Sequence, residues 1–179
     1  MSHLNNESVI GVIGAGTMGA GIAQVAAKAG HPVMLFDAME GAGQKGLDGI
    51  AKGLGRLVER GKMSQEDVDA LTGRIQVASS LQDLAPCGLI IEAIVERLDI
   101  KQQVFGDLED ICGENVIIAT NTSSISVTAI GSKLKRPQNL VGMHFFNPAP
   151  IMKLVEVISG LFFNDTATTE IYTLSAKWG

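Results

Sequence analysis

The stretch that decides the fold of this 179-residue chain is VIGVIGAGTMGAGIAQVAAKAG, which runs from Val9 to Gly30. The apolar run Ser8–Ile13 predicts a buried strand, and the alanine-rich run Thr17–Ala29 predicts a helix that Gly30 closes. Between them lies a GxGxxG turn made of Gly14, Ala15, Gly16, Thr17, Met18 and Gly19. Its spacing predicts a strand that turns tightly into a helix.

The three glycines of this turn have separate physical roles. Gly14 permits the tight turn, Gly16 lets the backbone approach a pyrophosphate, and Gly19 lets the helix pack closely on the strand. The helix N-terminus adds unpaired N–H groups and a positive dipole end, both suited to phosphate. We therefore expect Gly14–Gly19 to bind the phosphates of a dinucleotide. The alternative is a glycine-rich turn without a ligand.

An acidic residue further along specifies the dinucleotide. The second predicted strand, Val33–Phe36, is followed by Asp37, which lies 21 residues after Gly16. A carboxylate in that place accepts hydrogen bonds from the adenosine ribose hydroxyls. The next residues bring no arginine that could meet a 2′-phosphate; they are Ala38, Met39 and Glu40. The sequence therefore predicts NAD rather than NADP as the cofactor.

Short apolar runs alternate with longer amphipathic runs along the chain. The predicted strands are Ser8–Ile13, Val33–Phe36, Arg74–Ala78, Gly88–Ile94, Asn115–Thr120, Asn139–Phe145 and Lys153–Ile158. The predicted helices are Thr17–Ala29, about 40–60, a short one that Ser64 caps, and Leu98–Ile111. Continuous apolar strands that alternate with helices are typical of a parallel sheet covered on both faces. We predict an α/β protein of Rossmann type, with a doubly wound, mostly parallel sheet and helices on both faces.

The composition excludes several classes of protein. Apolar residues make up 46% and charged residues 18%, as in compact globular chains. The net charge of −5 offers no basic surface to nucleic acid or to an anionic membrane. Cys87 and Cys112 lack metal-ligand spacing, which favours free thiols in a reducing compartment and no metal site. Because the N-terminus lacks a signal-like pattern and no apolar run could span a bilayer, we expect a cytoplasmic protein.

Three polar clusters lie where predicted strands end, which is the edge at which such sheets bind ligands. They are Glu92 and Glu96 with Lys101, then Asn121–Ser124, then His144 with Asn147. Each has a purely structural alternative: a first-turn helix acid, a cap, or a histidine satisfied within the core. Their convergence on one edge, beside a nucleotide-binding turn, favours a functional site.

His144 has the chemistry of a general base, because imidazole titrates near neutral pH and can take a proton from an alcohol as hydride leaves. Such a base needs an acceptor that fixes its tautomer and stabilises the imidazolium. Glu156 is the candidate, since a carboxylate between Val155 and Val157 is costly to bury without a partner. The turn Asn147–Pro150 would reverse the chain and bring the two strands side by side.

Four segments resemble the NAD-binding domain of the 3-hydroxyacyl-CoA dehydrogenases, a family that includes bacterial 3-hydroxybutyryl-CoA dehydrogenases. They are GVIGAGTMGAGIAQVAA, IIEAIVERLDIKQQVF, NTSSI and GMHFFNPAPIMKLVEV. The resemblance extends from about residue 8 to Leu161. It implies reversible oxidation of a (3S)-hydroxyacyl-CoA to a 3-oxoacyl-CoA with NAD, in fatty acid and butanoate metabolism.

The resemblance also implies roles for individual residues. His144 is the catalytic base, Glu156 is its partner, and Ser123 donates a hydrogen bond to the substrate oxygen at the reacting carbon. The nicotinamide end is implied to be lined by Glu96, Lys101, Ser123 and Asn147. The residues Gly14 to Gly19 and Asp37 bind the other end. Ser123 and Asn147 would also contact the substrate.

A basic stripe on the long helix offers a further substrate contact. Lys52, Arg56 and Arg60 recur at intervals of four and so share one helical face. By the same resemblance, Arg60 contacts the coenzyme A phosphates. Gly53 departs from members of the family that have a serine contact there. A solvated basic stripe without a ligand is the alternative.

The family pattern predicts a domain over residues 1–161, with a different segment after it. The family continues into a helical domain that builds the homodimer and the rest of the acyl site, and we expect that domain to be absent here. The segment 162–179 contains NDTATTEIYTLS, which reads like one translation frame of a sequencing-adapter oligonucleotide. We therefore expect an assembly artefact, with a genuine extension as the alternative, and we assign no site to Tyr172 or Trp178.

Two other functions stay open on the sequence alone. A non-catalytic, redox-sensing dinucleotide-binding module needs the glycine turn but neither His144 nor Glu156. The other is a hydroxyacid dehydrogenase of the same superfamily, against which the stretch HFFNP argues by resemblance. Acyl-chain length, the physiological direction and the oligomeric state do not follow from these residues. With part of the acyl site missing, we expect this chain alone to be poorly active.

Overall fold

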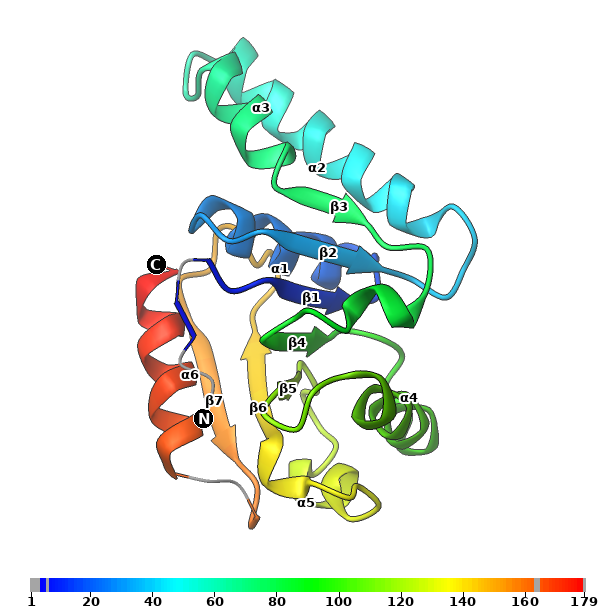
Figure 1. Cartoon of the computed structure of the whole chain (residues 1–179). Helices are drawn as coiled ribbons and strands as arrows, with labels where there is room; N and C mark the ends of the chain where they lie inside the picture. The colour runs from blue at the N-terminus through cyan, green and yellow to red at the C-terminus, as the bar shows by residue number, and fades with distance from the viewer. Residues whose placement is uncertain (1–3, 6, 163–164, 179) are drawn as a thin grey trace.

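The computed structural model describes residues 4–5, 7–162 and 165–178 (Figure 1). Its strands are β1 (Ile10–Ile13), β2 (Val33–Phe36), β3 (Ile75–Val77), β4 (Leu89–Glu92), β5 (Ile117–Thr120), β6 (Leu140–Phe145) and β7 (Val155–Ser159). Its α-helices are α1 (Thr17–Lys28), α2 (Ala42–Glu59), α3 (Gln65–Thr72), α4 (Leu98–Ile111), α5 (Val127–Gly131) and α6 (Asp165–Lys177). Two 3-10 helices are η1 (Leu81–Leu84) and η2 (Pro137–Asn139).

The strands form one sheet in the order β3-β2-β1-β4-β5-β6-β7. Every neighbouring pair is parallel except β6 and β7, which are antiparallel. The chain winds outward from β1 in one direction and from β4 in the other, so a topological switch point lies between these two strands. This arrangement confirms the predicted doubly wound, mostly parallel sheet.

Helices cover both faces of the sheet (Figure 1). One core cluster joins strand residues to Ile22 of α1, Ile50 of α2 and Ile171 of α6. The cluster on the other face contains Phe105 of α4 and Ile130 of α5. The central strands are buried on both faces, which explains why they read as continuous apolar runs rather than alternating ones.

The segment assigned to a separate tail contains helix α6, which lies against β7 at the sheet edge (Figure 1). Ile171 and Leu174 on this helix are buried in the same core cluster as α1. Within the described residues, no helix has the length and apolar character needed to cross a membrane. Cys87 and Cys112 are both buried, and each is a free cysteine.

Candidate functional site

The glycine turn has the geometry that its spacing predicts. Gly14 has a φ of +95°, and a Cβ there would lie 2.5 Å from the carbonyl oxygen of Ala93. A Cβ on Gly19 would lie 1.6 Å from the carbonyl oxygen of Gly14, so α1 can pack this closely only with glycine in that position. The structural roles predicted for Gly14 and Gly19 are confirmed.

Gly16 differs from these two positions, because no atom lies within 4 Å of the place a Cβ would take. The space above this residue is therefore open, and it adjoins the N-terminus of α1, where Gly16 is the N-cap without a side-chain cap. A pyrophosphate fits such a place, since the backbone N–H groups and the helix dipole face it. A side chain at Gly16 would fill the same space.

Asp37 follows β2 and ties the glycine turn to the next loop. Its carboxylate accepts hydrogen bonds from the backbone N–H of Ala15 at 2.7 Å and from that of Met39 at 2.9 Å. An ionised carboxylate offers about four acceptor positions, so the ribose hydroxyls can still be bound. Asp37 therefore fixes the turn in addition to its predicted role, and the sequence alone did not indicate this second function.

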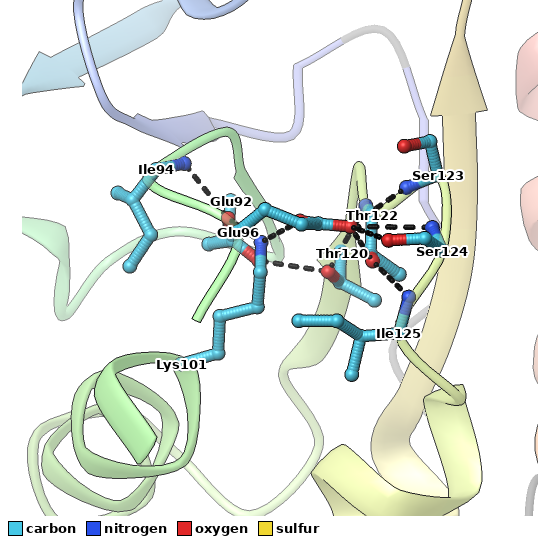
Figure 2. Close-up of polar contacts among 9 residues, drawn as sticks. All are labelled: Glu92, Ile94, Glu96, Lys101, Thr120, Thr122, Ser123, Ser124 and Ile125. Carbon is cyan, nitrogen blue, oxygen red and sulfur yellow. Dashed lines mark hydrogen bonds and ion pairs between the residues drawn. The ribbon is translucent and has the colours of Figure 1, made fainter. Parts of the chain in front are cut away.

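Glu92 and Lys101 form a buried ion pair beneath the same edge of the sheet (Figure 2). Glu92 ends β4 and is 0% exposed, while Lys101, in the first turns of α4, is 1% exposed. The ammonium donates to Glu92 Oε1 at 2.6 Å and lies 3.2 Å from Glu96 Oε2. One lysine thus sits between two carboxylates.

Glu96 anchors the loop that follows β5 (Figure 2). Its Oε1 accepts a hydrogen bond from the Thr122 hydroxyl and others from the backbone N–H groups of Ser123 at 3.1 Å and Ser124 at 3.2 Å. Burial of the carboxyl would raise its pKa, but the hydrogen bonds from Thr122 and Lys101, with the charge of Lys101, lower the pKa to about 2. Glu96 is therefore a fixed anion at neutral pH.

This pKa predicts how acid weakens the loop anchor. Because the pKa of Glu96 is lower in the folded chain, its stabilising contribution is fully present above the ordinary value of 4.5 and is lost as the pH falls toward about 2. We expect the difference in unfolding free energy between wild type and Glu96→Gln to be constant near neutral pH and to shrink below about pH 4.5. Urea denaturation at several pH values measures it. Glu114→Gln, at an exposed position, is the control.

His144 and Glu156 are paired as predicted. They are opposite each other in the antiparallel register of β6 and β7, and His144 Nδ1 lies 2.8 Å from Glu156 Oε2. The chain reverses through the predicted turn, where Ile151 and Met152 donate to the Pro148 carbonyl. The Phe146 ring packs beside the imidazole, with ring centroids 4.7 Å apart. The ring is thus held from two sides.

Comparison with known proteins identifies the family to which this arrangement belongs. The family model described as 3-hydroxyacyl-CoA dehydrogenase, NAD binding domain, matches residues 9–179. The chain belongs to this family. NAD is accordingly the cofactor of the domain.

Relatives of the chain include several 3-hydroxyacyl-CoA dehydrogenases. It is 44% identical over 174 residues to 3-hydroxyadipyl-CoA dehydrogenase of Escherichia coli, covering 97% of this chain and 37% of that one. It is 45% identical over 166 residues to 3-hydroxybutyryl-CoA dehydrogenase of Clostridioides difficile, covering 93% and 59%. The crystal structure of (S)-3-hydroxybutyryl-CoA dehydrogenase from Ralstonia eutropha superposes with a TM-score of 0.93 at 42% identity, covering 97% and 61%. The chain thus spans only about 37–59% of the length of these two curated relatives.

The remaining candidate residues lie in different parts of the structure. Ser123 and Asn147 are exposed in loops that follow β5 and β6, at the ends of the strands. Arg60 is the C-cap of α2, and the 18 residues of that helix correspond to about 27 Å. Figure 1 shows α2 running back from the ends of β1 and β2. The C-terminal half of α2 lines a pocket together with the turn after β6, and Arg60 is not among the lining residues. Its contact with coenzyme A stays a prediction, as does direct contact of the buried Lys101 with the cofactor.

Two contacts at this edge of the sheet were not predicted from the sequence: Thr120 was not a candidate residue, and Asn121 was predicted only as part of a polar cluster. The Thr120 hydroxyl donates to Glu92 Oε2 at 2.7 Å, and the Asn121 side-chain oxygen accepts from Phe145 N–H at 2.8 Å. The second contact fixes the start of the turn between β6 and β7 relative to β5. The only sequence signal was the position of these polar residues directly at the end of a buried strand.

Proposed function

We propose that this chain provides the NAD-binding and catalytic part of an enzyme that oxidises (3S)-3-hydroxyacyl-CoA to 3-oxoacyl-CoA. The observation that carries the proposal is the pair of His144 and Glu156, hydrogen-bonded at 2.8 Å where β6 ends. A redox sensor needs a dinucleotide-binding turn but no paired base and carboxylate. The names of the relatives support the same substrate class.

The chemistry of each side chain follows from its contacts. Glu156 accepts from Nδ1–H of His144, which leaves Nε2 to accept the proton of the substrate hydroxyl. The imidazolium that results is stabilised by the adjacent carboxylate. The exposed Ser123 hydroxyl would donate to the substrate oxygen, and Glu96 holds the backbone of that serine in place. Bound NAD supplies the hydride acceptor. In the reverse direction His144 returns the proton.

We expect the domain to bind NADH in preference to NADPH. Asp37 lines a pocket of about 650 Å³ whose other ionisable lining residues are Glu40, Asp107 and Asp110, all acidic. A 2′-phosphate would meet this negative charge, and like charges at close range cost several kcal/mol. We expect NADH to bind at least about tenfold more tightly than NADPH in a fluorescence titration. Equal affinities would contradict the assignment of Asp37.

The proposed reaction is tested by following NADH consumption with acetoacetyl-CoA. Because the chain spans about half of its relatives' length, we expect it to turn over slowly alone. We expect turnover to rise when the remaining part of a relative is fused to it. Binding of NADH without any activity in that fusion would favour a non-catalytic dinucleotide-binding module. Activity with a simple hydroxyacid but not with the CoA ester would favour a hydroxyacid dehydrogenase.

The same resemblance supports a cytoplasmic location and a homodimer formed by a further helical domain. The adapter-derived origin of residues 162–179 stays a prediction that rests on the sequence of the segment. The packing of α6 and the extent of the family match are both expected of a genuine part of the domain. Sequencing the gene across codon 162 decides between an artefact and a genuine segment, because uninterrupted reads in the source genome would exclude an artefact.

A further inference from the structure

We propose that Glu92 is a positioning residue, which acts through Lys101 and Glu96 to hold Ser123 and the nicotinamide end of the site. The inference rests on the proposed function for the identity of that end. Glu92 is fully buried and does not face the open edge of the sheet. Its influence on the site therefore has to pass through the groups that it holds.

Both oxygens of the Glu92 carboxylate accept hydrogen bonds. Its Oε1 accepts from Lys101 Nζ at 2.6 Å and from the Ile94 N–H at 2.7 Å, and its Oε2 accepts from the Thr120 hydroxyl at 2.7 Å. These donors come from α4, from the loop after β4, and from β5. Glu92 thus joins three elements at one point (Figure 2).

The charge of Lys101 is shared between a buried and a partly exposed carboxylate. A buried ammonium needs a partner, and Glu92 provides the fixed one because it ends a central strand of the sheet. The second contact, at 3.2 Å, goes to Glu96 Oε2. Lys101 therefore holds one oxygen of Glu96 and leaves the other to bind the loop after β5.

That other oxygen determines the conformation of the loop. Glu96 Oε1 accepts from the backbone N–H groups of Ser123 and Ser124 and from the hydroxyl of Thr122. The N–H of Thr122 in turn donates to the Thr120 hydroxyl, which also bonds Glu92. The loop is thus held by two routes that both lead back to Glu92. The Ser123 hydroxyl lies outside this network in Figure 2, where it can meet a ligand.

The replacement Glu92→Gln tests the inference, because glutamine keeps the shape and removes the charge. We expect the affinity for NADH to fall about tenfold, while ADP-ribose, which lacks the nicotinamide, binds within about twofold of wild type. In 1H–15N spectra, the amide signals of Ser123 and Ser124 should move while that of Ala15 stays. The matched control is Glu109→Gln, which replaces another buried glutamate of the α4 region that binds the N–H groups of Lys135 and Arg136.

Each outcome has a definite meaning. Equal loss of NADH and ADP-ribose would show a general structural role and overturn the inference, as would unchanged binding of both with unmoved amide signals. If Glu92→Gln does not fold, Thr120→Val removes one of the two routes and should weaken NADH about threefold with the same selectivity. If wild type binds neither nucleotide, the proposed function fails. The amide signals of Ser123 and Ser124 then still decide the role of Glu92.

Discussion

Replacing Gly19 with alanine is expected to destroy NADH binding and to destabilise the domain by about 3 kcal/mol or more. The added methyl group would lie 1.6 Å from the Gly14 carbonyl oxygen. That atom belongs to the backbone of the glycine turn, so no side-chain rotation can relieve the overlap. Helix α1 would have to move away from β1, and its N-terminus, which we propose binds the phosphates, would move with it. Urea denaturation and NADH fluorescence measure the two effects.

The control for this replacement is Gly53→Ala, in the middle of α2. No atom lies within 4 Å of the place its Cβ would take. Alanine there should stabilise the protein by about 0.5–1 kcal/mol, since glycine is the poorer helix former. NADH binding should not change. If Gly19→Ala binds NADH like wild type, the packing of α1 on the glycine turn does not hold the phosphate site.

Contacts between neighbouring segments were predictable from the sequence. The glycine turn and the hairpin of β6 and β7 each depend on a short stretch of chain, and the turn and the pairing of His144 with Glu156 were both predicted correctly. The errors lie at strand ends and in two helices, α5 and α6, which were not predicted. Strand β1 begins at Ile10 rather than Ser8, because the Ser8 N–H bonds the Asn5 carbonyl in a turn. Strand β7 begins at Val155 rather than Lys153, just after the turn in which Met152 donates to the Pro148 carbonyl.

For contacts between distant segments, the sequence predicted only which residues lie at the same edge of the sheet. The sequence placed Glu92, Glu96 and Lys101 at one edge of the sheet, but not their order from the core to the surface. The contact of Thr120 with Glu92 joins residues 28 positions apart in the chain, and it depends on the register between β4 and β5. A side chain as long as that of lysine can reach either the solvent or the core. The neighbouring carboxylates decide which, and only the folded arrangement specifies them.

Replacing His144 with glutamine is expected to lower the rate of NADH consumption with acetoacetyl-CoA at least about 100-fold, the lower range for loss of a general acid–base group. The amide can still donate to Glu156 and contact Phe146, so the hairpin should keep its structure. It cannot move a proton at neutral pH. The glycine turn, Asp37 and Glu96 are unchanged, so NADH affinity should stay within about twofold. High protein concentration makes slow turnover measurable as a ratio of variant to wild type.

The replacement Glu156→Gln separates the role of Glu156 in orienting the imidazole from the role of its negative charge. Its amide oxygen can still accept from His144 Nδ1–H and keep the imidazole oriented, but the negative charge that stabilises the imidazolium is lost. We expect a loss smaller than that of His144→Gln, about tenfold, because the base itself remains. Retention of the wild-type rate by His144→Gln would contradict its role as base. Equal losses in both variants, with NADH binding intact, would mean that the charge of Glu156, rather than its hold on the ring, makes His144 competent to take the proton.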